Sequence, residues 1–261
     1  MDINKRIDEI FDELVEIRRD FHKNPELSQN EFRTQKKIIE YLNSWGIGNY
    51  VCAETGAVGI IKGKNKGKTV GIRGDIDALP INEKNNVPYS SIAPGVMHAC
   101  GHDAHAAIVL GIAKIMKELA DTEDSINGNV KLFFQPAEET IGGADRMIQE
   151  GCMENPKVDY VLGLHVQPYL NTGKVELKYG KLNAATDSIN IVLKGKAAHG
   201  AYPDKGIDAI VMAGNVITAL QSIVSRNTSP INSVVISLGK ISGGVKDNII
   251  ADEVKITGTL R

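Results

Sequence analysis

The chain has 261 residues, of which 42% are hydrophobic and 24% are charged, so it can bury a large core in one or two globular domains. Its formal net charge of -2 and isoelectric point near 6.3 exclude the strongly basic surface that binds nucleic acid, and favour a small-molecule partner. Three cysteines are too few for a disulfide scaffold, which favours a reducing cytoplasmic location.

The chain begins with a charged segment in which apolar residues recur at helical spacing from Ile3 to Ile17. This spacing predicts an amphipathic helix that stops near Asn24 and Pro25, and the segment has no signal-peptide core. No stretch further along approaches the ~20 apolar residues of a membrane span, so we expect no membrane partner.

Helices and strands alternate through the next part of the chain. The patterns predict helices over 31–45, 104–119 and 142–149, and strands over 58–62, 69–73, 130–134 and 158–164. Alternation of this kind is typical of an α/β domain with helices packed on a mostly parallel sheet, whose active edge lies at the carboxyl ends of the strands.

The pattern changes beyond about residue 179. A strand over 188–194, a helix over 207–224 and β-rich segments over 234–241 and 249–260 predict a second, smaller α+β unit. We therefore expect a catalytic metal-binding domain over 1–178 and a second domain over 179–261.

The segment from Met97 to His105 carries the densest chemical signal, with three of the six histidines and one cysteine ahead of a predicted helix. Imidazole and thiolate suit zinc and its neighbours, and a helix N-terminus favours the ionised form of Cys100. Two alternatives stay open: a polar helix start with a buried cysteine, and a Cys100 nucleophile with a histidine base. Inhibition by a chelator rather than by a thiol alkylator would favour the metal.

Glu138 and Glu139 directly follow the predicted strand 130–134, at the carboxyl edge of the sheet. Adjacent side chains can point in different directions, so one carboxylate could bind a metal and the other could take a proton from water. The alternative is a solvated pair at a helix N-terminus.

Three further residues follow strands in the same way: His165, Asp75 and Asp77. Each alone has an ordinary interpretation, as a core histidine or a turn-forming aspartate. Their common position at strand ends favours a two-metal site. In the second unit, His199, Asn248 and Arg261 read by themselves as a loop histidine, a turn amide and a surface cation.

Together these motifs resemble the metal-dependent amidohydrolases that include aminoacylases, hippurate hydrolases and the indole-acetyl-amino-acid hydrolases of plants. The resemblance spans nearly the whole chain and is carried, in order, by Arg18–Glu26, Arg73–Pro80, Met97–His105, Gln135–Glu139, Gly163–His165, Ala197–His199 and Gly258–Arg261. It implies that the second unit is a ferredoxin-like lid and dimerisation domain, and that the protein is a homodimer through this lid.

The resemblance also implies a role for each site residue. It implies two divalent ions, with zinc, manganese and cobalt all suited to the ligand set, and it implies as metal ligands Cys100, His102, Glu139 and His165. Glu138 would be the general base and Asp77 would orient a ligand. His199 would stabilise the oxyanion across the dimer, and Asn248 and Arg261 would hold the substrate carboxylate.

The expected activity is hydrolysis of N-acyl amino acids to a free amino acid and a carboxylic acid. A dipeptidase or an N-acetyl-diaminopimelate-type deacetylase would use the same machinery. Members of the family that this sequence resembles continue beyond the position of Arg261 and supply a last histidine ligand. We therefore expect a C-terminally truncated chain with both domains incomplete, and an inactive metal-binding or dimerising fragment is a further alternative.

Overall fold

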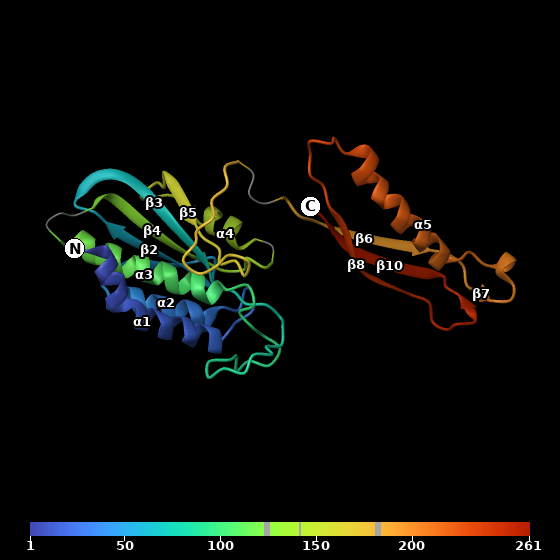
Figure 1. Ribbon diagram of the computed structural model, residues 1–261, viewed down its shortest axis with the longest axis horizontal. Coiled ribbons are helices and arrows are strands. Elements are labelled where there is room, and N and C mark those ends of the chain that lie inside the picture. The colour runs from blue at the N-terminus through green and yellow to red at the C-terminus, as the bar shows by residue number, and fades with distance from the viewer. Residues whose placement is uncertain (123–125, 141, 181–183) are drawn as a thin grey trace. The chain divides into compact units, whose positions relative to one another are not determined.

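The computed structural model describes residues 1–122, 126–140, 142–180 and 184–261, which form two compact units, Met1–Lys174 and Val175–Arg261 (Figure 1). The sequence predicts a boundary between residues 178 and 179, close to this division. The assignment of the units as a catalytic domain and a lid stays a prediction.

A five-stranded sheet in the order β1-β2-β4-β3-β5 forms the first unit. Its strands are β1 (Gly48–Cys52), β2 (Gly56–Lys62), β3 (Asn65–Asp75), β4 (Asn127–Gln135) and β5 (Tyr160–Gly163). The strands β4, β3 and β5 are parallel to one another, whereas β2 pairs antiparallel with both β1 and β4. The α/β class is therefore confirmed, and the sheet is mixed. The sequence analysis missed β1, because its mostly exposed residues show no clear alternation.

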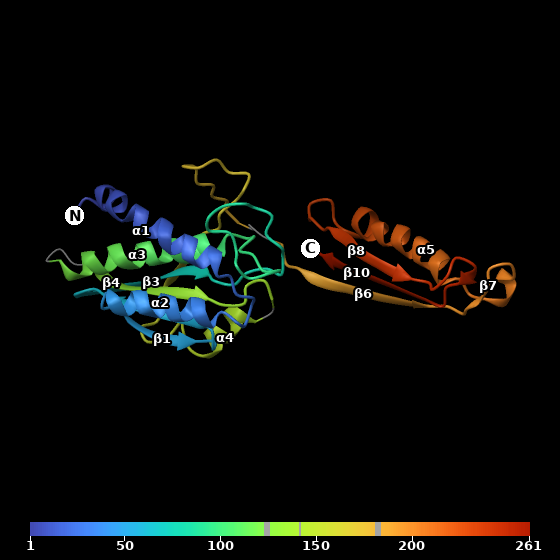
Figure 2. The same cartoon turned by 90° about the horizontal axis from the view of Figure 1, so that it is seen from below.

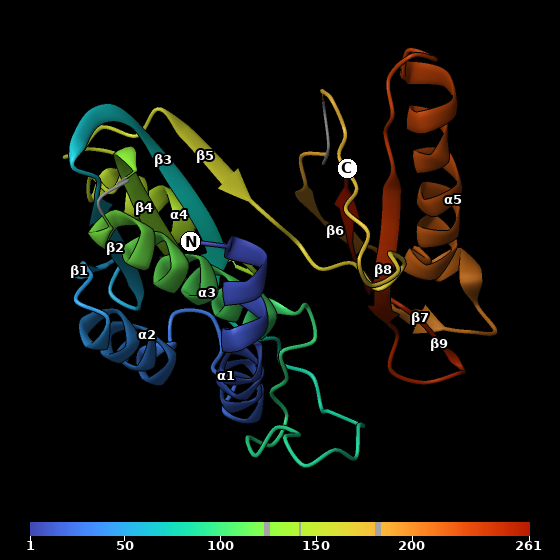
Figure 3. The ribbon, with the colours of Figure 1, turned by 60° about the vertical axis from the view of Figure 1, so that its left-hand side comes forward.

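Helices cover both faces of this sheet. They are α1 (Ile3–Lys23), α2 (Phe32–Ser44), α3 (His102–Asp121) and α4 (Gly143–Gln149). Successive residues of β4 point to opposite faces, so Leu132 and Phe134 pack in the core under α1, α2 and α3 while Phe133 packs with Met147 of α4. Figures 2 and 3 show α3 lying along the sheet, which places the start of α3 near the carboxyl ends of β3 and β4.

Glu26 explains how α2 begins. Its carboxylate accepts hydrogen bonds from the N–H groups of Arg33 (3.0 Å) and Thr34 (2.8 Å), and from the Thr34 hydroxyl (2.9 Å). The first N–H groups of a helix have no partner within the helix, so this carboxylate from outside satisfies them.

The second unit consists of a three-stranded antiparallel sheet with one long helix packed on it. The sheet has the order β6-β10-β8, with β6 (Asp187–Lys194), β8 (Ile236–Gly243) and β10 (Glu253–Leu260). The helix α5 (Ala209–Ser222) buries Ala209 and Ala213 with residues of β10, and Asp208 caps its N-terminus. A short pair, β7 (Ala198–His199) and β9 (Ile249–Ile250), completes the unit; β7 was not predicted.

The helix α5 has an exposed apolar side. With its π-helical continuation it runs from Ala209 to Asn227, which is long and apolar enough to cross a membrane by length and composition alone. This corrects the expectation that no stretch approaches such a length, although core helices of soluble proteins pass the same test. Ile210 and Val211 are 55% and 60% exposed, so part of the apolar surface has no cover within the described residues of this chain.

Candidate metal centre

The loops that follow three parallel strands bring the predicted site residues together. Asp75 ends β3 opposite Gln135, the last residue of β4, and Arg73 pairs with Gly163 at the end of β5. The carboxyl ends of parallel strands meet at one edge of a sheet. The segments after β3, β4 and β5 therefore lie at the same edge, beside the start of α3.

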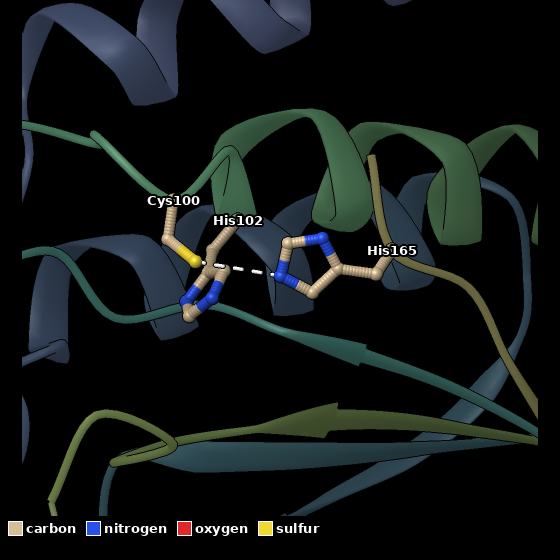
Figure 4. Close-up of side chains that lie close together, drawn as sticks. All are labelled: Cys100, His102 and His165. Atoms are coloured by element: carbon tan, nitrogen blue, oxygen red, sulfur yellow. Dashed lines mark hydrogen bonds between the residues drawn. The ribbon is translucent and has the colours of Figure 1, made fainter. Parts of the chain in front are cut away.

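Cys100, His102 and His165 converge at this edge (Figure 4). One ligand atom from each lies within 4.8 Å of the others, and the Cys100 Sγ is 3.4 Å from the His165 Nε2. His102 is fully buried, whereas His165 is exposed and follows β5 by two residues. A thiol and two imidazoles at this spacing form a set of zinc-type ligands.

The two glutamates predicted for the site approach His102 from the loop after β4. Glu138, Glu139 and His102 each offer one ligand atom within 4.8 Å of the others, and the Glu139 Oε1 is 3.8 Å from the His102 Nε2. Glu138 is exposed to solvent and Glu139 is half-buried. The alternative of a helix N-terminus is wrong, because α4 begins only at Gly143.

These residues fit a bound cation. The His102 Nε2 and the Glu139 Oε1 are buried and have no hydrogen-bond partner within the part of the chain that the structure describes. A buried polar atom without a partner is costly, and a cation between these two acceptors would remove that cost.

Asp77 holds His102 from the side opposite these acceptors. Its Oδ1 lies 3.1 Å from the His102 Nδ1, and its Oδ2 accepts from the Ser28 hydroxyl (2.7 Å) and the Glu139 N–H (3.0 Å). Burial alone would raise the pKa of Asp77, but the hydrogen bonds from His102, Ser28 and Glu139 lower it to about 2. The ionised carboxylate keeps a proton on the His102 Nδ1 and leaves the Nε2 free to act as a ligand.

The Cys100 thiol differs from its predicted state. Burial, followed by the carboxylates of Glu139, Glu138 and Asp75, raises its pKa to about 12. The expectation that the helix N-terminus favours the thiolate considered only the helix, whereas burial and these carboxylates favour the neutral thiol. A thiol with this pKa also argues against a cysteine nucleophile, and Cys100 would have to lose its proton on binding a metal.

A cleft of about 550 Å³ opens beside Cys100, and Arg18, His22 and Glu83 on its lining belong to an ion cluster that the sequence analysis missed. The Asp103 carboxylate accepts from the Arg18 Nε (2.6 Å) and from the His22 Nδ1 (2.8 Å), while the His22 Nε2 lies 3.1 Å from Glu83. These contacts tie α1, α3 and the loop after β3 together at one wall of the cleft. The only sequence signal was the resemblance over Arg18–Glu26, which by itself gives no partner for His22.

The other two histidines of the Met97–His105 motif are buried. Burial lowers the pKa of His98 to about 4, and neither of its ring nitrogens has a hydrogen-bond partner among the described residues. The Nδ1 of His105 lies 2.5 Å from the Asp75 Oδ1. Burial alone would raise the pKa of Asp75, but the His105 hydrogen bond and the charges of His102 and Arg73 lower it.

In the second unit the structure brings His199 and Asn248 together. The carbonyl of Asn248 accepts from the Gly200 N–H (2.8 Å), and the His199 Nδ1 accepts from the Ala201 N–H (3.1 Å). Because its Nδ1 accepts, a neutral His199 carries its proton on Nε2. Arg261 directly follows β10, whose eight residues span about 25 Å, and Asn248 lies before the opposite end of that strand. One copy of the unit therefore does not join these two residues at one carboxylate, and their shared role stays a prediction.

Comparison with known proteins gives one family. Residues 71–257 match the model of the peptidase family M20/M25/M40. The chain is 45% identical over 250 residues to the N-acetyl-L-cysteine deacetylase of Bacillus subtilis, covering 95% of this chain and 59% of that protein. It is 42% identical over 259 residues to thermostable carboxypeptidase 2 of Saccharolobus solfataricus, covering 98% of this chain and 65% of that protein.

A solved structure agrees with these relatives. The YXEP protein of Bacillus subtilis, described as a dinuclear metal binding peptidase of the M20 family, superposes with a TM-score of 0.77 at 36% sequence identity. The match covers 97% of this chain and 65% of that one. The chain thus spans between 59% and 65% of the length of these three proteins.

Proposed function

Because this chain belongs to the peptidase family M20/M25/M40, we propose that it contributes the metal centre of an amidohydrolase that cleaves N-acyl amino acids. The observation that carries the proposal is the convergence of Cys100, His102, His165 and Glu139 at one sheet edge, with unpartnered ligand atoms on His102 and Glu139. The N-acyl amino acid substrate is supported by the 45% identity to a deacetylase of N-acetyl-L-cysteine.

The four converging residues would hold two divalent ions, as zinc, manganese or cobalt. Ions at this place would polarise the amide carbonyl and lower the pKa of water toward ~7. The chain itself orients two of these ligands. Asp77 directs the His102 Nε2 toward Glu139, and the same carboxylate fixes the backbone of Glu139.

Glu138 would move the proton. It is the exposed member of the carboxylate pair and lies beside His102 and Glu139, so it can face a water molecule and the substrate at once. Its carboxylate would take one proton as the water oxygen bonds to the carbonyl carbon. It would then give that proton to the amide nitrogen as the carbon–nitrogen bond breaks, releasing the amine and the acid.

The second unit would complete the site. The His199 Nε2–H is the donor that an oxyanion needs, since its Nδ1 is engaged with the Ala201 N–H. Asn248 and Arg261 would bind the substrate carboxylate, and their separation along β10 fits contributions from two copies of the chain better than from one. The exposed apolar side of α5 supports a homodimer formed through this unit. We place the enzyme in the cytoplasm.

A second candidate is a carboxypeptidase or dipeptidase, which the 42% identity to a carboxypeptidase favours. A deacetylase of an N-acetyl-diaminopimelate type is a third. All three use the same centre and differ in the group that flanks the amide. A panel of N-acetyl amino acids, hippurate and dipeptides separates them by the ratio of their kcat/KM values.

The experiment that tests the mechanism compares the chain with its Glu138→Gln variant, each as it stands and extended at the C-terminus with the corresponding segment of the Bacillus subtilis deacetylase. We expect metal-dependent hydrolysis whose rate falls about 10²–10⁴-fold in the variant, because the side-chain amide of glutamine cannot accept a proton from water. Glu40→Gln is the matched control, since Glu40 is an exposed carboxylate on α2 whose only side-chain partner is Lys37 among the described residues.

Metal content read beside the rates separates the possible failures. A Glu138→Gln protein that keeps both metal and full activity would refute the proton-transfer role. Metal without activity in the chain, and activity in the extended protein, would show that this chain is a metal-binding fragment of the enzyme. No metal in either protein would refute the site.

A further inference from the structure

His105 is completely buried one turn after His102 on α3, and both of its ring nitrogens are engaged. The Nε2 accepts a hydrogen bond from the Val166 N–H at 2.9 Å. A nitrogen that accepts carries no proton, so the proton of the neutral ring is on Nδ1, which donates to Asp75 at 2.5 Å. The two contacts therefore fix one tautomer of His105.

The backbone of the same residue, Val166, also fixes His165, through its carbonyl oxygen. The His165 Nδ1 lies 2.6 Å from the Val166 carbonyl oxygen, which can only accept, so the Nδ1 carries a proton. That leaves the His165 Nε2 with a free lone pair, and this nitrogen faces Cys100 at 3.4 Å. This is the nitrogen and the tautomer that a metal ligand at this position requires.

These contacts form one continuous chain from Asp75 through His105 and the backbone N–H and carbonyl of Val166 to His165. We propose that Asp75 and His105 are positioning residues, which act through the backbone of Val166 to set the ring orientation and tautomer of His165. The inference rests on the proposed function in one respect, the assignment of His165 as a metal ligand.

A direct role for His105 in binding metal fits the contacts less well. Asp75, His102 and His105 do offer ligand atoms within 4.8 Å of one another. His105 could bind an ion only by giving up its hydrogen bond with Val166 or with Asp75, whereas the His102 Nε2 in this group has no hydrogen-bond partner among the described residues. The exposed segment that carries His165 gains a fixed anchor from this buried ring.

The first test needs no metal. Two-bond ¹H–¹⁵N spectra of the metal-free chain report histidine tautomers directly, and we expect the Nδ1–H form for both His105 and His165. His105→Gln places an amide oxygen near the former Nε2 and keeps a partner for Val166, whereas His105→Asn reaches only toward Asp75. We expect His165 to keep its tautomer in the glutamine variant and to show a mixture in the asparagine variant.

The second test measures Zn²⁺ and Co²⁺ affinity by competition with a chromophoric chelator. Loss of a partner that orients a ligand typically weakens metal binding 10–100-fold, so we expect this loss in His105→Asn and a smaller one in His105→Gln. The same pair is then made in a His165→Ala background. If His105 acts through His165, the asparagine and glutamine variants should bind equally there, because the positioned ligand is gone.

The outcomes separate this inference from the proposed function. If His105→Asn still binds metal more weakly than His105→Gln in the His165→Ala background, by the same factor as in the native background, the relay is overturned and His105 only packs in the core. An unchanged His165 tautomer in His105→Asn would overturn it too. If the native chain binds no metal, the proposed function fails, and the tautomer spectra still decide whether Asp75 and His105 set the ring of His165. Circular dichroism and thermal unfolding show whether each variant is folded.

Discussion

Replacing Gly101 by alanine tests how closely the start of α3 and the His165 segment fit together. Gly101 has a φ of +87° at the N-cap of α3, a left-handed conformation that costs an L-residue about 1–2 kcal/mol. A Cβ atom at this position would also lie 2.4 Å from the Val166 Cγ2. The substitution therefore has two separate effects, one on the backbone and one on Val166.

The steric effect has a calculable consequence for the metal centre. Carbon atoms in contact sit ~3.5 Å apart, so Val166 has to retreat by about 1 Å. A retreat of that size stretches the 2.9 Å hydrogen bond from Val166 to His105 beyond the ~3.5 Å at which such a bond is lost. We therefore expect Gly101→Ala to lower the free energy of unfolding by about 1–2 kcal/mol and also to weaken metal binding about tenfold.

Gly151→Ala is the matched control, assayed by urea denaturation and by metal competition. Gly151 has a φ of +83°, and among the described residues, its immediate chain neighbours aside, no heavy atom lies within 4 Å of a Cβ added there. It should lose the same stability with no change in metal affinity. If Gly101→Ala binds metal as tightly as the native chain, Val166 makes room by rotating its side chain, and the coupling argued here is wrong.

Two further predictions concern the first unit. The hydrogen bond to Asp103 raises the pKa of His22 above its ordinary 6.5; burial opposes this shift and the hydrogen bond to Glu83 adds to it. The stability that His22 contributes is therefore complete below pH 6.5 and is lost as the pH rises through the raised pKa. NMR titration of His22 and urea unfolding from pH 5 to 9 can follow this loss. Glu26→Ala should lower the free energy of unfolding by about 1 kcal/mol, because it removes the carboxylate that caps α2. Glu40→Ala, on the solvent side of α2, should lower it less. An unchanged free energy of unfolding in Glu26→Ala would contradict the capping role.

Hydrophobic periodicity predicted the larger elements of the fold well. The helix predicted to stop near Asn24 ends at Lys23, and the predicted strand 130–134 lies within β4. The short strands β1 and β7 were not predicted, because five or fewer residues of mixed exposure show no reliable alternation of apolar and polar side chains. Composition likewise gave no sign that Lys131 of β4 is fully buried, donating to the carbonyls of Cys152 and Glu154.

The site shows the same division between local and distant information. Residue type marked Cys100 and His102 ahead of a helix, and position at strand ends marked Glu138, Glu139 and His165. The choice of Cys100, His102, Glu139 and His165 as the ligand set came from the family resemblance. The raised pKa of Cys100 could not be predicted, because it depends on burial and on carboxylates from other loops.

The position of His105 beside the metal centre could have been predicted from the sequence, but its role could not. It stands three residues after His102, so a helix must place both rings on one face. The spacing does not predict the hydrogen bond from the backbone N–H of Val166, which lies 61 residues further along the chain. Because the His105 Nε2 accepts this bond, His105 holds the segment that carries the proposed ligand His165 instead of binding metal itself. The distinction rests on which ring nitrogen accepts a hydrogen bond, and only the folded chain supplies that donor. In a motif with two histidines at helical spacing, the metal ligand is therefore expected to be the histidine that keeps a ring nitrogen without a hydrogen bond to the backbone. Among the described residues of this motif's pair, that histidine is His102, through its Nε2.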